Sequence, residues 1–442
     1  MMWNNFGRVF LLPLLTLWFS WQFEHTSAFM RIRLEDYGGV GDNQTDNTRA
    51  FRRALQDIQA SGGGSLSLGP HGIFATLPFN LTSHMSLILF QNTTIVARGC
   101  EEEIEHNCTC KAWPQLQPLA NYGLDHDIGA PSRYQSLVYV QDFVNVSIIG
   151  HGSTSVIDGS GRFWWEAHLQ RRLAIGRPHL IEALRGSQFV VRDCVLKDSP
   201  FWTLHPVAVN GVRVSRIEVK TPLERAPNTD GVDPDACRDV IIRDSTIQTN
   251  DDCIAIKAGL NCFGKVYGPC EGVIIQNVTC VNAIVIGSEM SGGVSNVTIL
   301  NSTGRLYYKT GEKRGGYITD IDAQNIVVPQ DKRLPMQKYG LRITTSYGFK
   351  PSRCGASWNP QPTNIKGLSF SGIWGAPGLG ILNWSVNIDA SHANITDLTI
   401  ANIRLPTARS GVGFLCETAA NTVIHGTAFN DIPRACPQLS ES

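Results

Sequence analysis

The sequence predicts an all-β protein, a parallel β-helix in which the chain winds through successive coils. Short β-branched runs such as FVNVSIIG from Phe143 and GVIIQNVTC from Gly272 alternate apolar and polar positions, which is typical of strands. Asn, Asp and Gly separate these runs and indicate tight turns. Most successive copies lie roughly 22 to 33 residues apart, within the range of solenoid coils.

A β-sandwich is the alternative fold, since it also consists of short strands and turns. Its strands recur about every 8 to 12 residues without a longer period, so the observed spacing favours the solenoid. The length of 442 residues would suggest about three domains. A repeat fold grows as one unit, however, and we therefore expect a single domain over residues 29–442.

Residues 1–28 have the layout of a secretory signal peptide. Arg8 precedes a short apolar run over residues 9–21, and the small residues Thr26-Ser27-Ala28 offer a cleavage site. An uncleaved membrane anchor is the alternative, but the run is short for a bilayer span and contains Pro13. The prediction is a secreted protein, extracellular or in the cell wall, with no stable membrane association.

Two segments depart from the strand pattern. Residues 46–61 show helical spacing at Phe51, Leu55 and Ile58, which predicts an N-terminal helix that caps the open end of the solenoid. Residues 100–133 are rich in Pro, Trp and acidic side chains. We expect them to form a long inserted loop near the cleft.

Charge and cysteine content narrow the functional classes. The 38 basic and 38 acidic residues give a net charge of zero, so nothing at the level of the whole chain steers it to nucleic acid. Twelve cysteines fit an oxidising compartment and several disulfides, although sequence cannot fix their connectivity. The predicted bridges are Cys262–Cys270, Cys253–Cys280 and one among Cys100, Cys108 and Cys110.

Ten N-x-S/T sequons are compatible with secretion and with a glycoprotein, although several fall in strand repeats. They begin at Asn43, Asn80, Asn92, Asn107, Asn145, Asn277, Asn296, Asn301, Asn383 and Asn394.

Three carboxylates are candidates for catalysis. Asp230 and the pair Asp251-Asp252 lie about 21 residues apart, the length of one coil, so all three should meet on one face. Like charges at close range raise one pKa, which leaves one group able to donate a proton beside others able to accept one. Hydrolysis of a glycosidic bond requires that combination. The alternative is a set of turn carboxylates that bind backbone donors.

Five motifs together resemble glycoside hydrolase family 28, the polygalacturonases and related pectinases. The resemblance covers residues 31–328 well and implies a right-handed β-helix with its cleft on one face. It also implies hydrolysis of α-1,4-galacturonosyl links in pectin with inversion. The motifs are NTDG at Asn228, DDC at Asp251, SPFWTLHP at Ser199, IGSEMSGG at Ile286 and DYGGVGDNQTDNTRAF at Asp36.

The resemblance assigns roles by motif. Asp251 is expected to protonate the leaving oxygen, while Asp230 and Asp252 hold and deprotonate the attacking water; Asn228 is expected to bind substrate. Oxygens of the acid and base should then lie about 6.5 to 9.5 Å apart, the inverting range. No metal or other cofactor is implied. The expected partner is a pectic polysaccharide bound by a monomer.

The chain departs from the family pattern at two places. Asn282 stands where many members have a His, and the tripeptide YYK has Tyr307 where an Arg would fall. Lys309 stays in register. We expect Asn282, Tyr307 and Lys309 to bind substrate, with Arg305 or Arg314 as alternative cations. A phenol carries no charge, so the sequence predicts weak hydrolysis of plain polygalacturonate.

Four further residues could serve either function or structure. Alternation counted from Asp252 places Lys257 on the opposite face, as an outward lysine. His205 could line the cleft or bond within the stack, and Trp202 and Trp165 could stack on sugars or act as buried anchors.

Other functions remain open at this point. A chain without its cationic partners could be a weak or inactive β-helix protein that binds cell-wall carbohydrate, or a rhamnogalacturonan hydrolase. A calcium-dependent pectate lyase is a third class, which would need an Arg base and a carboxylate nest for Ca²⁺.

Overall fold

The computed structural model describes residues 29–100, 109–125, 127, 129–330, 339–348, 353–355, 357–377, 382, 384–393, 395–405, 414–417 and 424–425. The predicted signal segment, Cys108 and the sequons at Asn107, Asn383 and Asn394 lie outside these residues. In the described part of the chain, no helix is both long and apolar enough to cross a membrane.

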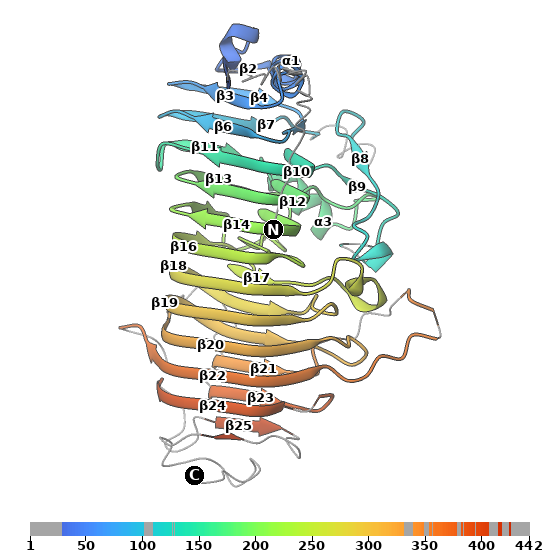
Figure 1. Ribbon diagram of the computed structural model, residues 1–442, viewed down its shortest axis with the longest axis vertical. Helices are drawn as coiled ribbons and strands as arrows, with labels where there is room; N and C mark the ends of the chain where they lie inside the picture. The colour runs from blue at the N-terminus through green and yellow to red at the C-terminus, as the bar shows by residue number, and fades with distance from the viewer. Residues whose placement is uncertain are drawn as a thin grey trace, which may run out of the picture.

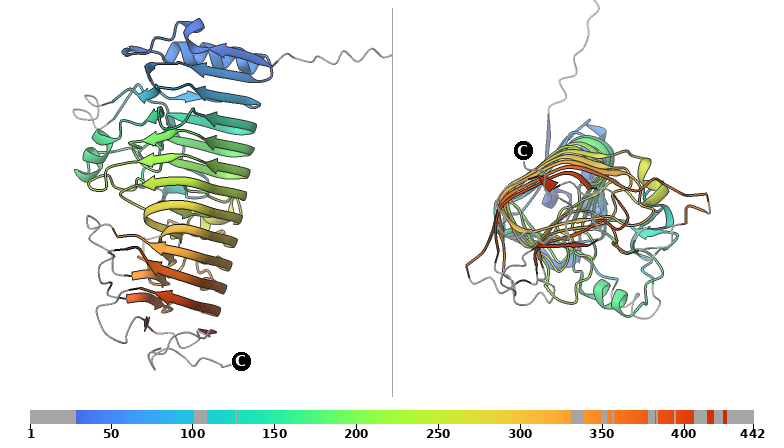
Figure 2. Two further views of the ribbon diagram at one scale, coloured as in Figure 1. Left: turned by 90° about the vertical axis from the view of Figure 1, so that its left-hand side faces the viewer. Right: turned by 90° about the horizontal axis from the view of Figure 1, so that it is seen from below.

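Within the described residues, the strands form one 24-stranded sheet wound into a right-handed parallel β-helix, the hand that parallel crossovers adopt in general. The coils stack along the long axis of the molecule, from the N-terminal strands at one end to β25 at the other (Figure 1). Seen along that axis, they enclose one interior (Figure 2). The predicted fold class is confirmed. The sheet already begins at β1 (Met30–Arg33), long before the repeat becomes visible near residue 143.

The strands of the first coils are β1 (Met30–Arg33), β2 (Asp42–Asp46), β3 (Gly64–Leu68), β4 (Gly72–Thr76), β5 (Phe79–Asn80), β6 (Met85–Leu89) and β7 (Thr93–Ala97). Those of the central coils are β10 (Val138–Ile149), β11 (Ser155–Asp158), β12 (Ile181–Arg192), β13 (Val195–Lys197), β14 (Leu204–Ser215), β15 (Glu218–Lys220), β16 (Arg238–Gln248) and β17 (Ile254–Ile256). Those of the later coils are β18 (Cys270–Gly287), β19 (Val294–Lys309), β20 (Tyr317–Val328), β21 (Tyr339–Thr344), β22 (Asn364–Gly375), β23 (Trp384–Asp389), β24 (Ile395–Arg404), β25 (Phe414–Glu417) and β26 (Ile424–His425).

One turn and one inward residue recur from coil to coil. Asn145, Gly272 and Asn296 adopt φ values of 55°, 68° and 54°, a left-handed backbone that Gly and Asn tolerate best. The residue after each turn points into the core, and parallel pairing stacks these residues in a column. The column comprises Val146, Phe189, Val212, Val240, Val273, Val297, Ile321, Leu368 and Leu398, each at most 1% exposed. The Asn-Val repeat of the sequence therefore reflects turn geometry.

The helix expected within residues 46–61 is present as α1 (Thr48–Ala60). It lies at the N-terminal end of the coils beside β3 and β5 (Figure 1). Phe51 and Ile58 are fully buried on the face that packs into the core.

The insertion around residues 109–137 lies outside the coils, near α3 (Arg162–Leu169) (Figure 1). Its short strands β8 (Gln115–Leu116) and β9 (Arg133–Tyr134) pair antiparallel. The residues that the structure describes also contain the short 3₁₀ helices η1 (Leu34–Tyr37), η2 (Gly123–Asp125) and η3 (Asn261–Lys265).

The disulfides agree with the prediction at two of three places. Cys100–Cys110 and Cys253–Cys280 are bonded. The predicted Cys262–Cys270 bridge is wrong, because Cys262 bonds Cys354, 92 residues away. Cys262 lies in η3 outside the coil, whereas Cys270 opens β18 with its thiol in the core, so closeness in sequence does not bring the two together.

Candidate active site

The three predicted carboxylates meet at one place on the outside of the helix. Val232 and Ile254 form a parallel bridge, and the Gly231 N–H donates to the Asp252 carbonyl, which puts Asp230 beside Asp252 on the neighbouring coil. One carboxylate oxygen from each of Asp230, Asp251 and Asp252 lies within 4.8 Å of the others. Adjacent strands lie about 4.8 Å apart, so the stacking of coils keeps Asp230 close to Asp252.

The expected separation of 6.5 to 9.5 Å is therefore wrong for these oxygens. That range assumes two carboxylates on opposite walls of a cleft. Here, two of the groups are sequence neighbours and the third is one coil away, which limits how far apart they can lie.

Two buried lysines neutralise two of the carboxylates. Lys309 Nζ lies 2.7 Å from Asp252 Oδ2, as expected for a site residue. Lys257 Nζ lies 3.4 Å from Asp230 Oδ2 and 3.3 Å from Glu289 Oε2.

The prediction that Lys257 points away from the cleft is wrong, because the residue is 2% exposed and lines the site. Asp252 precedes β17, so its side chain does not share the alternation of that strand. Counted instead from the inward Ile254 and Ile256, Lys257 falls on the cleft face.

Asp251 differs from its two neighbours. Its Oδ1 accepts the Asp252 N–H at 2.9 Å, and no described lysine or arginine forms an ion pair with it. Burial raises the pKa of Asp251 above its ordinary value, and the charge of Asp252 raises it further. Among the described residues, Asp251 is thus the carboxyl group of the three that has no ion-pair partner.

Burial also raises the pKa of Asp230, although the Lys257 ammonium group opposes this shift. Burial alone would lower the pKa of Lys309, but Asp252, Tyr347 and Asp251 together outweigh it and the pKa is raised. The pKa of Lys257 is raised as well, so both lysines stay charged, and the charge of Lys257 favours the ionised form of Asp230.

Asn228 lies at the cleft in a left-handed turn, with φ of 57°. Its Oδ1 accepts a hydrogen bond of 2.8 Å from the fully buried Arg177. The same guanidinium binds Asp127 at 3.0 Å. The insertion thus holds the NTDG loop in place through Arg177.

The two departures from the family pattern have different surroundings. The Asn282 amide donates to the Asp251 carbonyl at 2.8 Å, and its oxygen accepts from Arg305. Asn282 therefore supports the backbone of Asp251. Tyr307 lies farther along the face, with its ring 5.2 Å from Lys309 Nζ.

The carboxylates line a cleft of about 340 Å³. Sequence reasoning missed Tyr122, Glu289 and Tyr347, which come from three separate loops and carry no common motif. The lining residues are Tyr122, Asp127, His168, Phe201, Trp202, Asn228, Asp230, Asp251, Asp252, Lys257, Leu260, Ser288, Glu289, Lys309 and Tyr347.

The structure distinguishes the aromatic and histidine candidates that line the cleft from those that are buried in the protein. Trp202 lines the cleft, and Lys257 Nζ lies 4.0 Å from its ring centroid. Trp165 is a buried anchor that donates to the Ser199 carbonyl. His205 is fully buried within the stack, 3.2 Å from His179 and 3.3 Å from Asp235.

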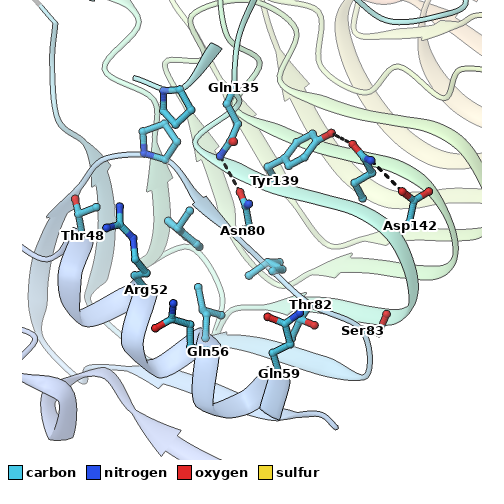
Figure 3. Close-up of a pocket in the computed structure, with 16 residues that line it drawn as sticks. Thr48, Arg52, Gln56, Gln59, Asn80, Thr82, Ser83, Gln135, Tyr139 and Asp142 are labelled. Carbon is cyan, nitrogen blue, oxygen red and sulfur yellow. Dashed lines mark hydrogen bonds between the residues drawn. The ribbon is translucent and has the colours of Figure 1, made fainter. Parts of the chain in front are cut away.

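A second pocket of about 560 Å³ lies between α1 and the start of β10 (Figure 3). Amide and hydroxyl side chains such as Gln56, Asn80 and Gln135 line most of it. Asp142 is the only carboxylate among its described lining residues, and Arg185 binds it. This pocket is larger but offers no acid and base pair, so the smaller cleft is the candidate active site.

Comparison with known proteins agrees with the geometry. Residues 128–424 match the family model described as "Glycosyl hydrolases family 28". A "Probable polygalacturonase" of Vitis vinifera is 35% identical over 327 residues, 71% of this chain and 63% of that protein; the chain thus spans less than two thirds of that relative. A "Polygalacturonase" of Persea americana is 26% identical over 88% of this chain and 80% of that protein.

Solved structures share the fold. An exopolygalacturonase from Thermotoga maritima superposes with a TM-score of 0.67 at 24% identity, covering 90% of this chain and 87% of that one. A polygalacturonase from Erwinia carotovora gives a TM-score of 0.59 at 22% identity, over 86% of this chain and 94% of that one.

Proposed function

The chain belongs to glycosyl hydrolase family 28, and we propose that it is a secreted glycosidase that hydrolyses α-1,4-galacturonosyl links in pectin. The observation that carries the proposal is that three carboxylates with oxygens within 4.8 Å of one another differ in their ion-pair partners. Asp230 and Asp252 each contact a lysine, and Asp251 contacts none among the described residues.

This difference assigns the roles. Asp251, which forms no ion pair with a described lysine or arginine, keeps a proton and donates it to the leaving glycosidic oxygen. Asp230 and Asp252, each in contact with a lysine ammonium group, are the proton acceptors. A single water can donate to both, because two hydrogen bonds of about 2.7 to 2.8 Å span an oxygen separation of this size. The water is then held and deprotonated at the anomeric carbon.

Inversion follows from the same contacts. The short separation of the carboxylates by itself is nearer to that of retaining enzymes, about 5 to 5.5 Å. A retaining nucleophile must be free to attack carbon, however, and the lysine contacts of Asp230 and Asp252 reduce their nucleophilicity. Water activation, and hence inversion, is the reaction that these contacts favour.

The cleft contains cations and aromatic rings that can contact an acidic sugar, although acids also line it. The whole chain is neutral, but Lys257 and Lys309 place two ammonium groups at the cleft, and Trp202 and Tyr347 offer rings for stacking. These groups together can bind a uronate sugar. An inactive wall-binding protein would not need three carboxylates arranged with unequal charge compensation.

The same lysines argue against a calcium-dependent lyase. A divalent cation among Asp230, Asp251 and Asp252 would face two ammonium groups that already neutralise the site. We therefore expect activity that does not depend on Ca²⁺.

The test is incubation of the purified protein with polygalacturonate and with rhamnogalacturonan, followed by chromatography of the products. Saturated uronate products in the presence of EDTA support the proposal. Unsaturated products that require Ca²⁺ would identify a lyase, and no cleavage of either polymer by a folded protein would refute the hydrolase. Cleavage of rhamnogalacturonan alone would change the substrate and keep the mechanism.

A further inference from the structure

The face that carries the carboxylates changes character along the solenoid. Glu182 and His205 occupy the same register position on the two strands that lie on the N-terminal side of the carboxylates. Both side chains are fully buried, so this part of the face is not accessible to a polymer. On the C-terminal side Tyr307 and Arg342 are in register on adjacent strands and are only partly buried. A polymer bound at the carboxylates therefore extends toward the C-terminal coils.

The Arg342 guanidinium packs against the rings of Tyr307 and Tyr339 next to the cleft. Its guanidinium carbon is 5.3 Å from the ring centroid of Tyr307 and 5.1 Å from that of Tyr339. The Tyr307 ring lies 6.1 Å from the ring of Tyr347, which lines the cleft. An unbroken surface therefore runs from the cleft to Arg342.

The hydrogen-bonding capacity of Arg342 is largely unused. Nη1 donates one long bond of 3.4 Å to the Tyr339 hydroxyl, and Nε is buried without a partner. Asp389, the nearby acid that attracts it, already accepts bonds from Thr344 and Ser391. Nη2 donates to no described residue, so an incoming acceptor finds an available donor here.

The two arginines considered from sequence are placed differently. Arg305 is 8% exposed and donates to Asn282. Arg314 is 4% exposed and donates to Asn261 at 3.2 Å. Both guanidinium groups donate hydrogen bonds to buried protein side chains. Arg342 is therefore the better candidate of the three for binding an external anion.

We propose that Arg342, with Tyr307 and Tyr339, forms a distal subsite that binds the carboxylate of a uronate residue on the C-terminal side of the cleft. Nη1 and Nη2 form the planar fork that matches a carboxylate; the partly exposed ring of Tyr307 packs against the sugar, and the buried ring of Tyr339 supports the guanidinium. The subsite lies three coils beyond the β17 coil, or about 14 Å at about 4.8 Å per coil, so a short run of sugar residues links it to the reacting bond. This subsite rests on the proposed function of the cleft.

The inference also revises the expectation of weak activity on plain polygalacturonate. Tyr307 itself is uncharged, but a guanidinium lies against its ring from the next coil. The missing cation is therefore supplied in register by a residue 35 positions later in the sequence, which no local motif reveals.

The test compares Arg342→Ala and Arg342→Lys with Arg243→Ala, a surface control whose side chain is 53% exposed. We expect Arg342→Ala to lower kcat/KM on plain polygalacturonate by roughly ten- to a hundredfold, the size of one charge-assisted contact. The loss should appear in KM with kcat nearly retained, and should be smaller on methyl-esterified polymer. Arg342→Lys keeps the charge without the fork and should recover part of the loss.

Failure of the subsite and failure of the cleft give different results. If the wild type cleaves the polymer and Arg342→Ala matches Arg243→Ala in KM, the subsite is refuted while the proposed function stands. If the wild type neither binds nor cleaves any pectic polymer, the proposed function fails and the subsite with it. Binding of long oligogalacturonate to Asp251→Asn, with and without Arg342→Ala, measures the contact without turnover; equal affinities would again refute it.

Discussion

Replacing Lys257 with Met tests the charge balance of the site. Met nearly preserves the length of the side chain and removes the ammonium group. Lys257 lies 3.4 Å from Asp230, 3.3 Å from Glu289 and 3.8 Å from Asp233. Without it, Asp230, Asp233 and Glu289 lose the ammonium group that they share.

The expected loss in the free energy of unfolding is large because the charged groups of this network are buried. The side chain of Lys257 is 3% exposed, and those of Asp230 and Asp233 are 5% and 0% exposed. Removing one partner of a buried ion pair typically costs about 3 to 5 kcal/mol. We expect Lys257→Met to fall in that range at pH 7. The control is Lys366→Met, whose ion pair with Asp397 is 60% and 54% exposed and is worth about 0 to 1 kcal/mol.

The loss should also depend on pH in a defined direction. Lys257 lowers the pKa of Asp230, so the variant raises it further above its unfolded value of about 3.9. Between those two pKa values the folded state binds more protons than the unfolded state, and stability falls as pH rises. The destabilisation is thus small in acid and grows through this window, and the acid limb of the pH–rate profile moves to higher pH.

Urea unfolding followed by tryptophan fluorescence at several pH values measures the first effect, and kcat/KM on polygalacturonate against pH measures the second. If Lys257→Met differs from the Lys366→Met control by less than about 1 kcal/mol and keeps the wild-type pH profile, then Lys257 does not compensate Asp230.

Three further outcomes are expected. Asp251→Asn keeps the shape of the acid but cannot donate a proton, so turnover of polygalacturonate should fall by at least ~10²-fold; NMR of the first-formed anomer from the wild type should show inversion, and retention would contradict the assignment of roles. Tyr307→Ala removes the ring beneath Arg342 and should raise KM for the polymer, whereas Tyr307→Phe keeps the ring and should stay near the wild type; equal effects of the two would show that the hydroxyl matters instead. Glu182 and His205 are fully buried at the N-terminal side of the cleft, so we expect the protein to release short products from the ends of the polymer. The viscosity of a polygalacturonate solution should then fall slowly relative to the release of reducing sugar. A rapid early fall in viscosity would indicate internal cleavage.

Sequence determined the fold and the reacting groups because both depend on local patterns. A turn residue followed by an inward β-branched residue recurs once per coil, as at Asn296 and Val297, and that period alone defines a solenoid. One coil also separates Asp230 from Asp252, so their meeting followed from counting residues. The Cys253–Cys280 bridge, between neighbouring coils, is predictable for the same reason.

Tertiary structure decided which loops meet and which residues of each strand face the cleft. Lys257 was misplaced because alternation must be counted from the inward isoleucines of β17, not from a turn aspartate. Cys262 pairs with Cys354 because loops outside the coil meet regardless of their distance in sequence. Arg342 reaches Tyr307 only through the parallel register of β19 and β21. Sequence therefore specifies which carboxylates react, while the stacking of coils and loops decides which charges surround them.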